Sequence, residues 1–218
     1  YISWRKKYCG VFKCVRDGVT YYFIDNEEYY NRPGLYSYDD DYERFAYFDY
    51  AVLELISHLQ LGVDVLHLHD WQTAMIAPLY REKYAMYPWY DNIKLVFTIH
   101  NIAYQGKADP RIVNSIFGLP DYLYENGNLQ NDNCFNMMKS AILYSDIITT
   151  VSPTYAKEIL TDEFGEGLQY ILRTRANDLY GILNGIDYAV NDPSTDKNLV
   201  ANFDLEHLDK KIENKLAL

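Results

Sequence analysis

An alternation of short apolar segments with longer helical patterns is the feature that most constrains the fold of this chain. Most of the apolar segments are rich in β-branched or aromatic residues and bounded by polar or turn residues, as buried strands are. The strands expected on this basis are residues 19–24, 63–69, 94–100, 147–151 and 180–183. Strands that alternate with helices predict an α/β domain with a doubly wound, mostly parallel sheet and right-handed crossovers.

Helices are expected between these strands. Apolar residues recur at helical spacing over residues 43–60, and Gly62 follows as a stop signal. A second helix should follow Asp70, with Pro78 either in its first turn or at a kink. The others are expected over residues 135–144, from Ser152 as the cap with Pro153 in the first helical position, over 168–176, and in the charged tail 205–218. Residues 105–133 show no clean period and are expected to form an irregular insertion.

The charge balance excludes some classes of function. The net charge is −11, from 20 Lys and Arg against 31 Asp and Glu, and the basic residues are scattered, which disfavours a nucleic-acid surface. No apolar run reaches eighteen residues, so no membrane-spanning helix is expected. Cys9, Cys14 and Cys134 lack zinc-like spacing and are interpreted as reduced thiols, which favours a cytoplasmic setting. The chain opens on Tyr1 without a signal-peptide pattern, and we expect further sequence upstream.

Polar residues follow four of the expected strands. In open α/β sheets, ligands bind outside the carboxyl ends of the strands. The segments at these ends are residues 67–72 (HLHDWQ), 98–106 (TIHNIAYQG), 151–154 (VSPT) and 184–187 (NGID). The sequence therefore predicts a binding site at one edge of the sheet.

Several of these residues have two interpretations. His67 and His69 share one face of a strand and could chelate a metal, although a buried, hydrogen-bonded His67 is the stronger expectation. Asp70 is either the N-cap of the next helix or a ligand for sugar hydroxyls, and Trp71 either packs in the core or stacks on a sugar ring. His100 could bind a hydroxyl or act as an acid or base.

Four segments resemble, in order and at comparable spacing, the motifs of the bacterial glycogen synthase and plant starch synthase family. They are His69-Asp-Trp71, residues 98–106, residues 150–158 (TVSPTYAKE) and residues 181–187 (GILNGID). The resemblance extends to residues 31–34 (NRPG) and 213–215 (ENK), and so covers nearly the whole chain. It implies a two-domain, Rossmann-like GT-B glycosyltransferase that is retaining, needs no metal or other cofactor, and moves glucose from ADP-glucose to the non-reducing end of an α-1,4-glucan.

The resemblance also implies roles for individual residues. His100 matches the histidine that contacts the donor glucose and is the expected catalytic residue. The substrate-binding residues expected from the match are Asp70, Trp71, Asn101, Tyr36 and Asn184. Asn184-Gly185, taken alone, is equally well a turn.

Two parts of the family pattern are not found in these 218 residues. They are the Lys-x-Gly-Gly loop that meets the nucleotide diphosphate and the C-terminal domain that neutralises it. We therefore expect residues 1–218 to be an incomplete N-terminal catalytic domain that is inactive alone. Two alternatives stay open: a non-catalytic glucan-binding module that uses Trp71, and a metal-dependent hydrolase that uses His67 and His69.

Overall fold

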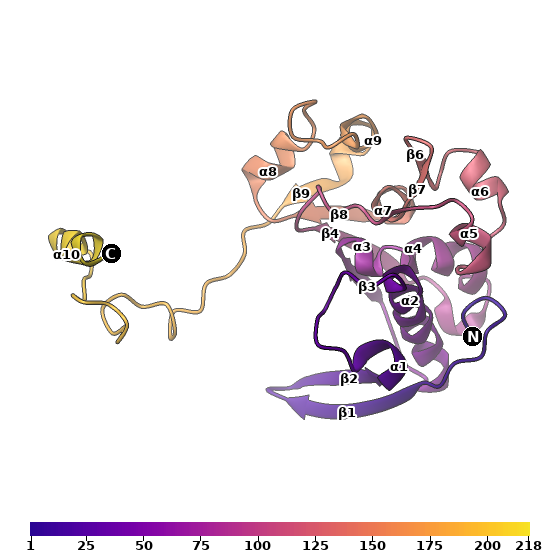
Figure 1. The fold of residues 1–218 in the computed structure, drawn as a ribbon, viewed down its shortest axis with the longest axis horizontal. Helices are drawn as coiled ribbons and strands as arrows, with labels where there is room; N and C mark the ends of the chain where they lie inside the picture. The colour runs from indigo at the N-terminus through magenta and orange to yellow at the C-terminus, as the bar shows by residue number, and fades with distance from the viewer. The chain divides into compact units, whose positions relative to one another are not determined.

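The computed structural model describes residues 1–218 (Figure 1). The chain forms two compact units, Tyr1–Ile182 and Leu183–Leu218. The first unit contains all nine strands and nine of the ten α-helices. No helix in the chain is long and apolar enough to cross a membrane.

A four-stranded parallel sheet organises the first unit. Its strands are β3 (Val65–His69), β4 (Lys94–Ile99), β8 (Ile147–Thr150) and β9 (Leu179–Gly181), and they lie side by side in this order. Register pairs such as Leu68 with Phe97 place the ends of β3 and β4 together. The expected α/β fold with a parallel sheet is confirmed, and four of the five expected strands form it.

The two faces of this sheet differ in burial. Leu68, Phe97 and Ile148 are adjacent on one face and are at most 2% exposed, within the main hydrophobic core. On the other face Val65 is 50% exposed and His67 is also exposed. The expectation of a buried His67 is therefore wrong, because β3 is an edge strand whose outer face is open.

The helices of the first unit lie close to their expected positions. Helix α2 (Asp41–His58) is the longest, and Ala46, Leu53 and Ile56 form its buried face. The segment after Asp70 is divided into α3 (Asp70–Thr73), α4 (Ile76–Leu79) and a π-helical segment (Tyr80–Tyr84), and Pro78 lies in the first turn of α4. The remaining α-helices of this unit are α1 (Glu27–Tyr30), α5 (Ile112–Ser115), α6 (Tyr122–Glu125), α7 (Met137–Tyr144), α8 (Pro153–Glu158) and α9 (Gln169–Thr174).

Local capping explains where two of these helices begin. The Ser152 side chain accepts a hydrogen bond of 2.8 Å from the Tyr155 backbone N–H, and Pro153 occupies the first turn, as expected for α8. Asn136 caps α7 in the same way through the Lys139 backbone N–H. Short 3₁₀ turns are found at Pro88–Tyr90 and Ala176–Asp178.

One expected strand is placed differently. Residues 19–24 lie in β2 (Val19–Asp25), which pairs with β1 (Gly10–Arg16) in an antiparallel hairpin and does not join the parallel sheet. The turn is Asp17-Gly18, with φ angles of 52° and 78°. Asp-Gly with both residues at positive φ suits a two-residue hairpin turn, which fixes the antiparallel pairing. Sequence reasoning did not use this signal and missed β1.

The expected irregular insertion contains short regular elements. Strands β5 (Lys107–Ala108), β6 (Gln130–Asn131) and β7 (Cys134–Asn136) form a small antiparallel sheet in the order β5-β7-β6. Helices α5 and α6 lie between β5 and β6 in the chain. Phe117, Leu119 and Leu129 from this segment are fully buried, so the insertion belongs to the core.

The second unit contains a 3₁₀ turn at Leu208–Lys210 and helix α10 (Lys211–Ala217). Its helix falls within the tail for which the sequence predicted one.

Candidate functional site

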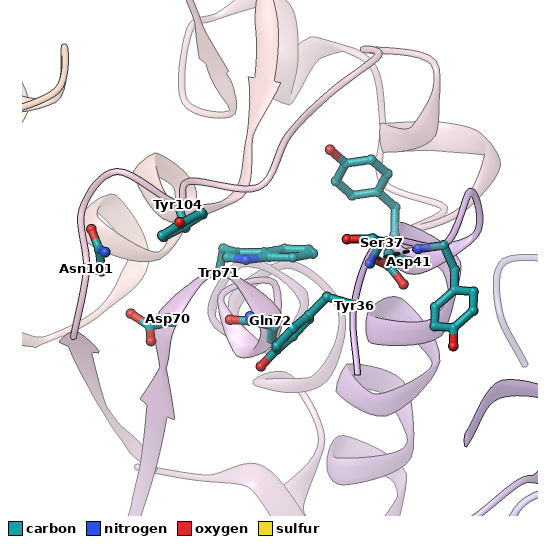
Figure 2. A pocket seen from close by; sticks show the side chains of 10 residues that line it. Tyr36, Ser37, Asp41, Asp70, Trp71, Gln72, Asn101 and Tyr104 are labelled. Carbon is teal, nitrogen blue, oxygen red and sulfur yellow. Dashed lines mark hydrogen bonds between the residues drawn. The ribbon is translucent and has the colours of Figure 1, made fainter. Parts of the chain in front are cut away.

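A pocket of about 670 Å³ opens at the carboxyl ends of β3 and β4. It has two sides: the segments that follow the two strands, and the loop that precedes α2. Figure 2 shows Trp71 among Tyr36, Asp70, Asn101 and Tyr104. The lining residues are Tyr36, Ser37, Tyr38, Asp41, Tyr42, Asp70, Trp71, Gln72, Asn101 and Tyr104. The structure thus brings together four residues that the sequence predicted separately: Tyr36, Asp70, Trp71 and Asn101.

Asp70 joins the ends of the two strands. It has a φ of 56°, in the left-handed region that few residues other than glycine adopt. Its Oδ1 accepts a hydrogen bond of 2.8 Å from the backbone N–H of His100. No side chain caps the start of α3, so Asp70 is not the N-cap that one interpretation expected. Strained backbone of this kind is often found at functional sites.

Trp71 is partly buried and forms one wall of the pocket. Its ring lies 5.0 Å from Phe45 in an edge-on arrangement and 5.8 Å from Tyr42. Gly106 lies directly against the indole, because a Cβ atom there would come within 2.8 Å of Trp71 Cε3. The indole therefore both packs against the core and contributes surface to the pocket. The two interpretations made from sequence are compatible.

The loop before α2 carries Tyr36, whose side chain is 54% exposed. Two arginines hold this loop. Arg32 binds Asp40 through two hydrogen bonds of 2.5 and 2.6 Å. The buried Arg44 donates to the Tyr29 and Leu35 carbonyls and to Asp41. These contacts lie on both sides of Tyr36 in the chain and hold its loop in place without a regular element.

His100 borders a second cavity, of about 530 Å³, which shares Tyr36, Asp70 and Gln72 with the first. Its Nε2 lies 3.0 Å from Nδ1 of His69, whose ring centroid is 4.2 Å from that of His67. Although both side chains are exposed, each ring is partly shielded from water, and this desolvation, with the neighbouring histidines, lowers the pKa of both His67 and His69 below the ordinary value. The two rings therefore favour the neutral state at neutral pH.

The remaining predicted residues have distinct surroundings. Asn101 is exposed and lines the pocket, and its Oδ1 accepts a hydrogen bond of 3.0 Å from the Ala103 backbone N–H. Asn184 is exposed in the second unit, and its role stays a prediction.

Six lining residues were not among the predicted site residues: Ser37, Tyr38, Asp41, Tyr42, Gln72 and Tyr104. Gln72 and Tyr104 stand within the two motifs that follow β3 and β4, so their position after a strand was an available signal. The other four come from the loop and first turn of α2, where the NRPG segment at residues 31–34 was the only marker.

The geometry gives no support to a metal centre built on His67 and His69. His67 Nε2 lies 2.6 Å from Thr98 Oγ1, and His69 Nδ1 faces His100. No three His, Cys, Asp or Glu side chains in the chain are grouped as metal ligands would be.

Comparisons with known proteins identify the family of the chain. Residues 1–174 match the family model described as the starch synthase catalytic domain. The chain belongs to this family. Glycogen synthases from Ligilactobacillus salivarius and Streptococcus agalactiae are 48% and 51% identical to it over 217 residues. These alignments include all of the chain but only 46% of each relative, so the chain spans about half the length of these glycogen synthases.

A solved structure of the same family is also similar. The catalytic domain of starch synthase IV from Arabidopsis thaliana, bound to ADP and acarbose, superposes with a TM-score of 0.80 and 37% identity. The match covers 96% of this chain and 43% of the plant domain. The chain therefore has the fold of the corresponding part of the GT-B starch synthase catalytic domain.

Proposed function

We propose that this chain forms the acceptor-side half of the active-site cleft of a retaining glucosyltransferase that uses ADP-glucose. In this reaction the bond between glucose C1 and the diphosphate oxygen breaks, and a bond forms between C1 and O4 at the non-reducing end of an α-1,4-glucan. The acceptor hydroxyl loses its proton, and ADP leaves. The observation that carries the proposal is the single pocket in which Tyr36, Asp70, Trp71 and Asn101 meet at the carboxyl ends of β3 and β4.

The lining chemistry of the pocket fits a glucan. Sugar rings present apolar faces that stack on aromatic rings, and hydroxyls that bind carboxylates and amides. Trp71, Tyr36 and Tyr104 supply aromatic surface. Asp70 keeps Oδ2 for a sugar hydroxyl while Oδ1 accepts the His100 N–H. The plant relative is bound to ADP and acarbose, which supports a nucleotide sugar and a glucan as the ligands proposed here.

His100 is proposed to contact the donor glucose. It immediately follows β4, and its backbone N–H is bound to Asp70. A group that contacts the reacting sugar contributes to the rate when its interaction is stronger in the transition state than in the ground state. For Asn184, the proposed role is the substrate-binding one that the family resemblance implies.

Glucan binding can be tested on the chain itself with Trp71 as the reporter. Trp4 and Trp89 are 77% and 53% exposed and lie outside the pocket, so replacing both with Phe leaves Trp71 as the only tryptophan. Maltoheptaose should then change the fluorescence in a saturable way, whereas a β-1,4-linked cello-oligosaccharide should not. An equal response to both sugars, or no response to either, would contradict the proposed glucan site.

Two tyrosines provide a matched control for this experiment. Tyr36 and Tyr122 are both 54% exposed, and only Tyr36 lines the pocket. Tyr36→Ala should weaken the response to maltoheptaose, and Tyr122→Ala should leave it unchanged.

The chain alone is proposed to give no measurable glucosyl transfer. In the family that the chain resembles, the groups that neutralise the leaving diphosphate belong to the Lys-x-Gly-Gly loop and to a second domain. One cationic side chain at such a site can be worth about 10³–10⁵ in rate. The assay is incorporation of labelled glucose from ADP-glucose into glycogen, beside a full-length glycogen synthase. Transfer within about a hundredfold of the full-length enzyme would overturn this part of the proposal.

A further inference from the structure

The side chain of His100 has one protein partner, the imidazole of His69. His69 is the last residue of β3 and His100 follows the last residue of β4, in neighbouring parallel strands. Their nitrogens, Nδ1 of His69 and Nε2 of His100, are 3.0 Å apart, and the ring planes are inclined by 35°. This distance is that of an N–H···N hydrogen bond. Asp70 fixes the backbone of His100, and His69 contacts its ring.

His69 is itself held in place by its surroundings. Its ring lies against that of His67, with centroids 4.2 Å apart. The Nε2 atom of His67 is 2.6 Å from Thr98 Oγ1, and Thr98 Oγ1 is 2.6 Å from Thr149 Oγ1. These contacts run across β8, β4 and β3. The His69 ring therefore presents Nδ1 to His100 from a supported position, and a supported neighbour can hold a reacting side chain in place.

The hydrogen bond constrains protonation as well as position. One of the two facing nitrogens must carry the proton and the other must offer its lone pair, so the bond selects a tautomer for each ring. Burial lowers the pKa of His69, which keeps that ring neutral and able to take part. Because the bond to His69 sets the protonation of His100 Nε2, it also sets whether Nδ1 of His100 donates a hydrogen bond to a ligand or accepts one.

We propose that His69 is a positioning residue that fixes the ring orientation and tautomer of His100. The consequence for catalysis rests on the proposed function, in which His100 contacts the donor glucose. The hydrogen bond itself can be tested without any activity. Histidine is present at five positions, 58, 67, 69, 100 and 207, so the imidazole signals can be assigned with single substitutions.

The test is ¹⁵N NMR of the imidazoles in the 218-residue chain at a pH where the rings are neutral. In the parent chain, His100 should show one dominant tautomer. His69→Ala should shift His100 toward the mixed tautomers of a free imidazole. His58→Ala is the control, because His58 is an exposed residue of α2 outside both cavities that border the site. An unchanged His100 tautomer in His69→Ala would overturn the proposal.

Two further variants separate positioning from stability. The side-chain amide of Asn can occupy the place of Nδ1, whereas that of Gln reaches the place of Nε2. His69→Asn should therefore restore the dominant His100 tautomer and His69→Gln should not, in variants whose circular dichroism shows the parent fold. Equal behaviour of Asn and Gln would contradict a role for Nδ1, and this comparison remains decisive if His69→Ala does not fold.

A full-length glycogen synthase that carries these residues provides the functional measurement. His69→Ala should lower kcat by about tenfold to a hundredfold, as displacement of a reacting group does, with little change in the KM for glycogen. His69→Asn should recover part of the loss. A normal kcat in His69→Ala, with the His100 tautomer altered as expected, would contradict the proposed function of His100 and leave the positioning interaction intact. A normal tautomer in the same variant would contradict the positioning interaction.

Discussion

The carboxylate of Asp70 accepts a hydrogen bond of 2.8 Å from the backbone N–H of His100, and so connects the ends of β3 and β4. Asp70 makes this contact from a left-handed backbone conformation, with φ at 56°. The two segments that carry Trp71 and Asn101 are thereby held together at one side of the pocket. A ligand that contacts both segments would meet a site whose two halves are already in place.

Two substitutions of Asp70 should separate the contribution of its hydrogen bond to stability from that of its backbone conformation. Asp70→Ala should lower the free energy of unfolding by about 1–3 kcal/mol, because the acceptor is lost and Ala tolerates positive φ poorly. Asp70→Asn should cost less, since Asn keeps Oδ1 as an acceptor and adopts this conformation more readily. Urea denaturation measures both values. Asp17→Ala is the control: Asp17 has a φ of 52° but is exposed in the hairpin turn. An equal loss at positions 17 and 70 would show that the hydrogen bond adds nothing.

Gly106 packs directly against the indole of Trp71. Gly106→Ala should displace the ring, because the new Cβ would lie 2.8 Å from Trp71 Cε3 and 3.1 Å from Met137 Sδ. Overpacking of this kind costs about 1–3 kcal/mol in addition to the cost of positive φ. Gly127→Ala is the matched control, since its φ is 89° and no atom lies within 4 Å of the added Cβ. Urea denaturation and Trp71 fluorescence should both change more in Gly106→Ala. Equal changes in the two variants would mean that the contact between Gly106 and Trp71 affects neither the stability nor the position of the indole.

The sequence predicted those parts of the site that depend on local patterns. Asp70, Trp71 and Asn101 directly follow apolar strands, and the ends of parallel strands meet at one edge of a sheet. Strand identity and the motifs were therefore sufficient to place them. Tyr38, Asp41 and Tyr42 could not be found in this way. They reach the pocket from the segment that Arg32 and Arg44 hold in place, and no short sequence period records such side-chain contacts.

The errors in the fold have similar origins. Residues 19–24 have the composition of a buried strand but pair in a hairpin, because the preceding Asp17-Gly18 turn decides their partner. His67 was expected to be buried, since its neighbours in the chain are apolar. Its exposure follows from the edge position of β3, which depends on the strand order β3-β4-β8-β9 and not on β3 itself.

Trp71 should affect glucan binding more than folding. Trp71→Ala should abolish the saturable response to maltoheptaose, measured by calorimetry because the fluorophore is removed. It should cost less stability than the about 3–5 kcal/mol of a fully buried tryptophan, because the indole is only partly buried. Trp71→Phe is the intermediate variant and should retain part of the binding. A large loss of stability with binding per folded molecule intact would show that Trp71 serves packing alone.

His100→Ala should lower turnover by several powers of ten in a full-length glycogen synthase that carries this site, while glucan affinity changes little. The reason is that the proposed contact is with the reacting sugar and not with the acceptor chain. Steady-state kinetics with ADP-glucose and a separate glycogen-binding assay measure the two quantities. His58→Ala, at an exposed position of α2, should behave as the parent. Turnover near the parent value in His100→Ala would contradict the assigned role.

Asp49 should make the stability of the chain depend on pH. This residue lies on the buried face of α2, is 1% exposed, and its Oδ1 has no hydrogen-bond partner. Burial raises the pKa of the Asp49 carboxyl well above its ordinary value, and a hydrogen bond from the Met75 backbone N–H only partly offsets this. The folded state therefore binds a proton more tightly than the unfolded state. The contribution of Asp49 to stability is full below the unfolded pKa of about 3.9 and decreases as pH rises toward the folded pKa.

The variant Asp49→Asn removes this titration with little change in size. The free energy of unfolding of Asp49→Asn, minus that of the parent, should increase as pH rises from about 4 through the raised folded pKa. Only the parent has a carboxyl at position 49, and its buried form loses stability over this pH range. Urea denaturation at a series of pH values measures the difference, in which the titration of all other groups cancels to first order. Asp49→Leu should show the same pH trend, since it also lacks the ionisable group, but with an added loss from the Met75 N–H left without its acceptor. A difference between Asn and parent that stays constant with pH would show that Asp49 titrates normally in the folded protein.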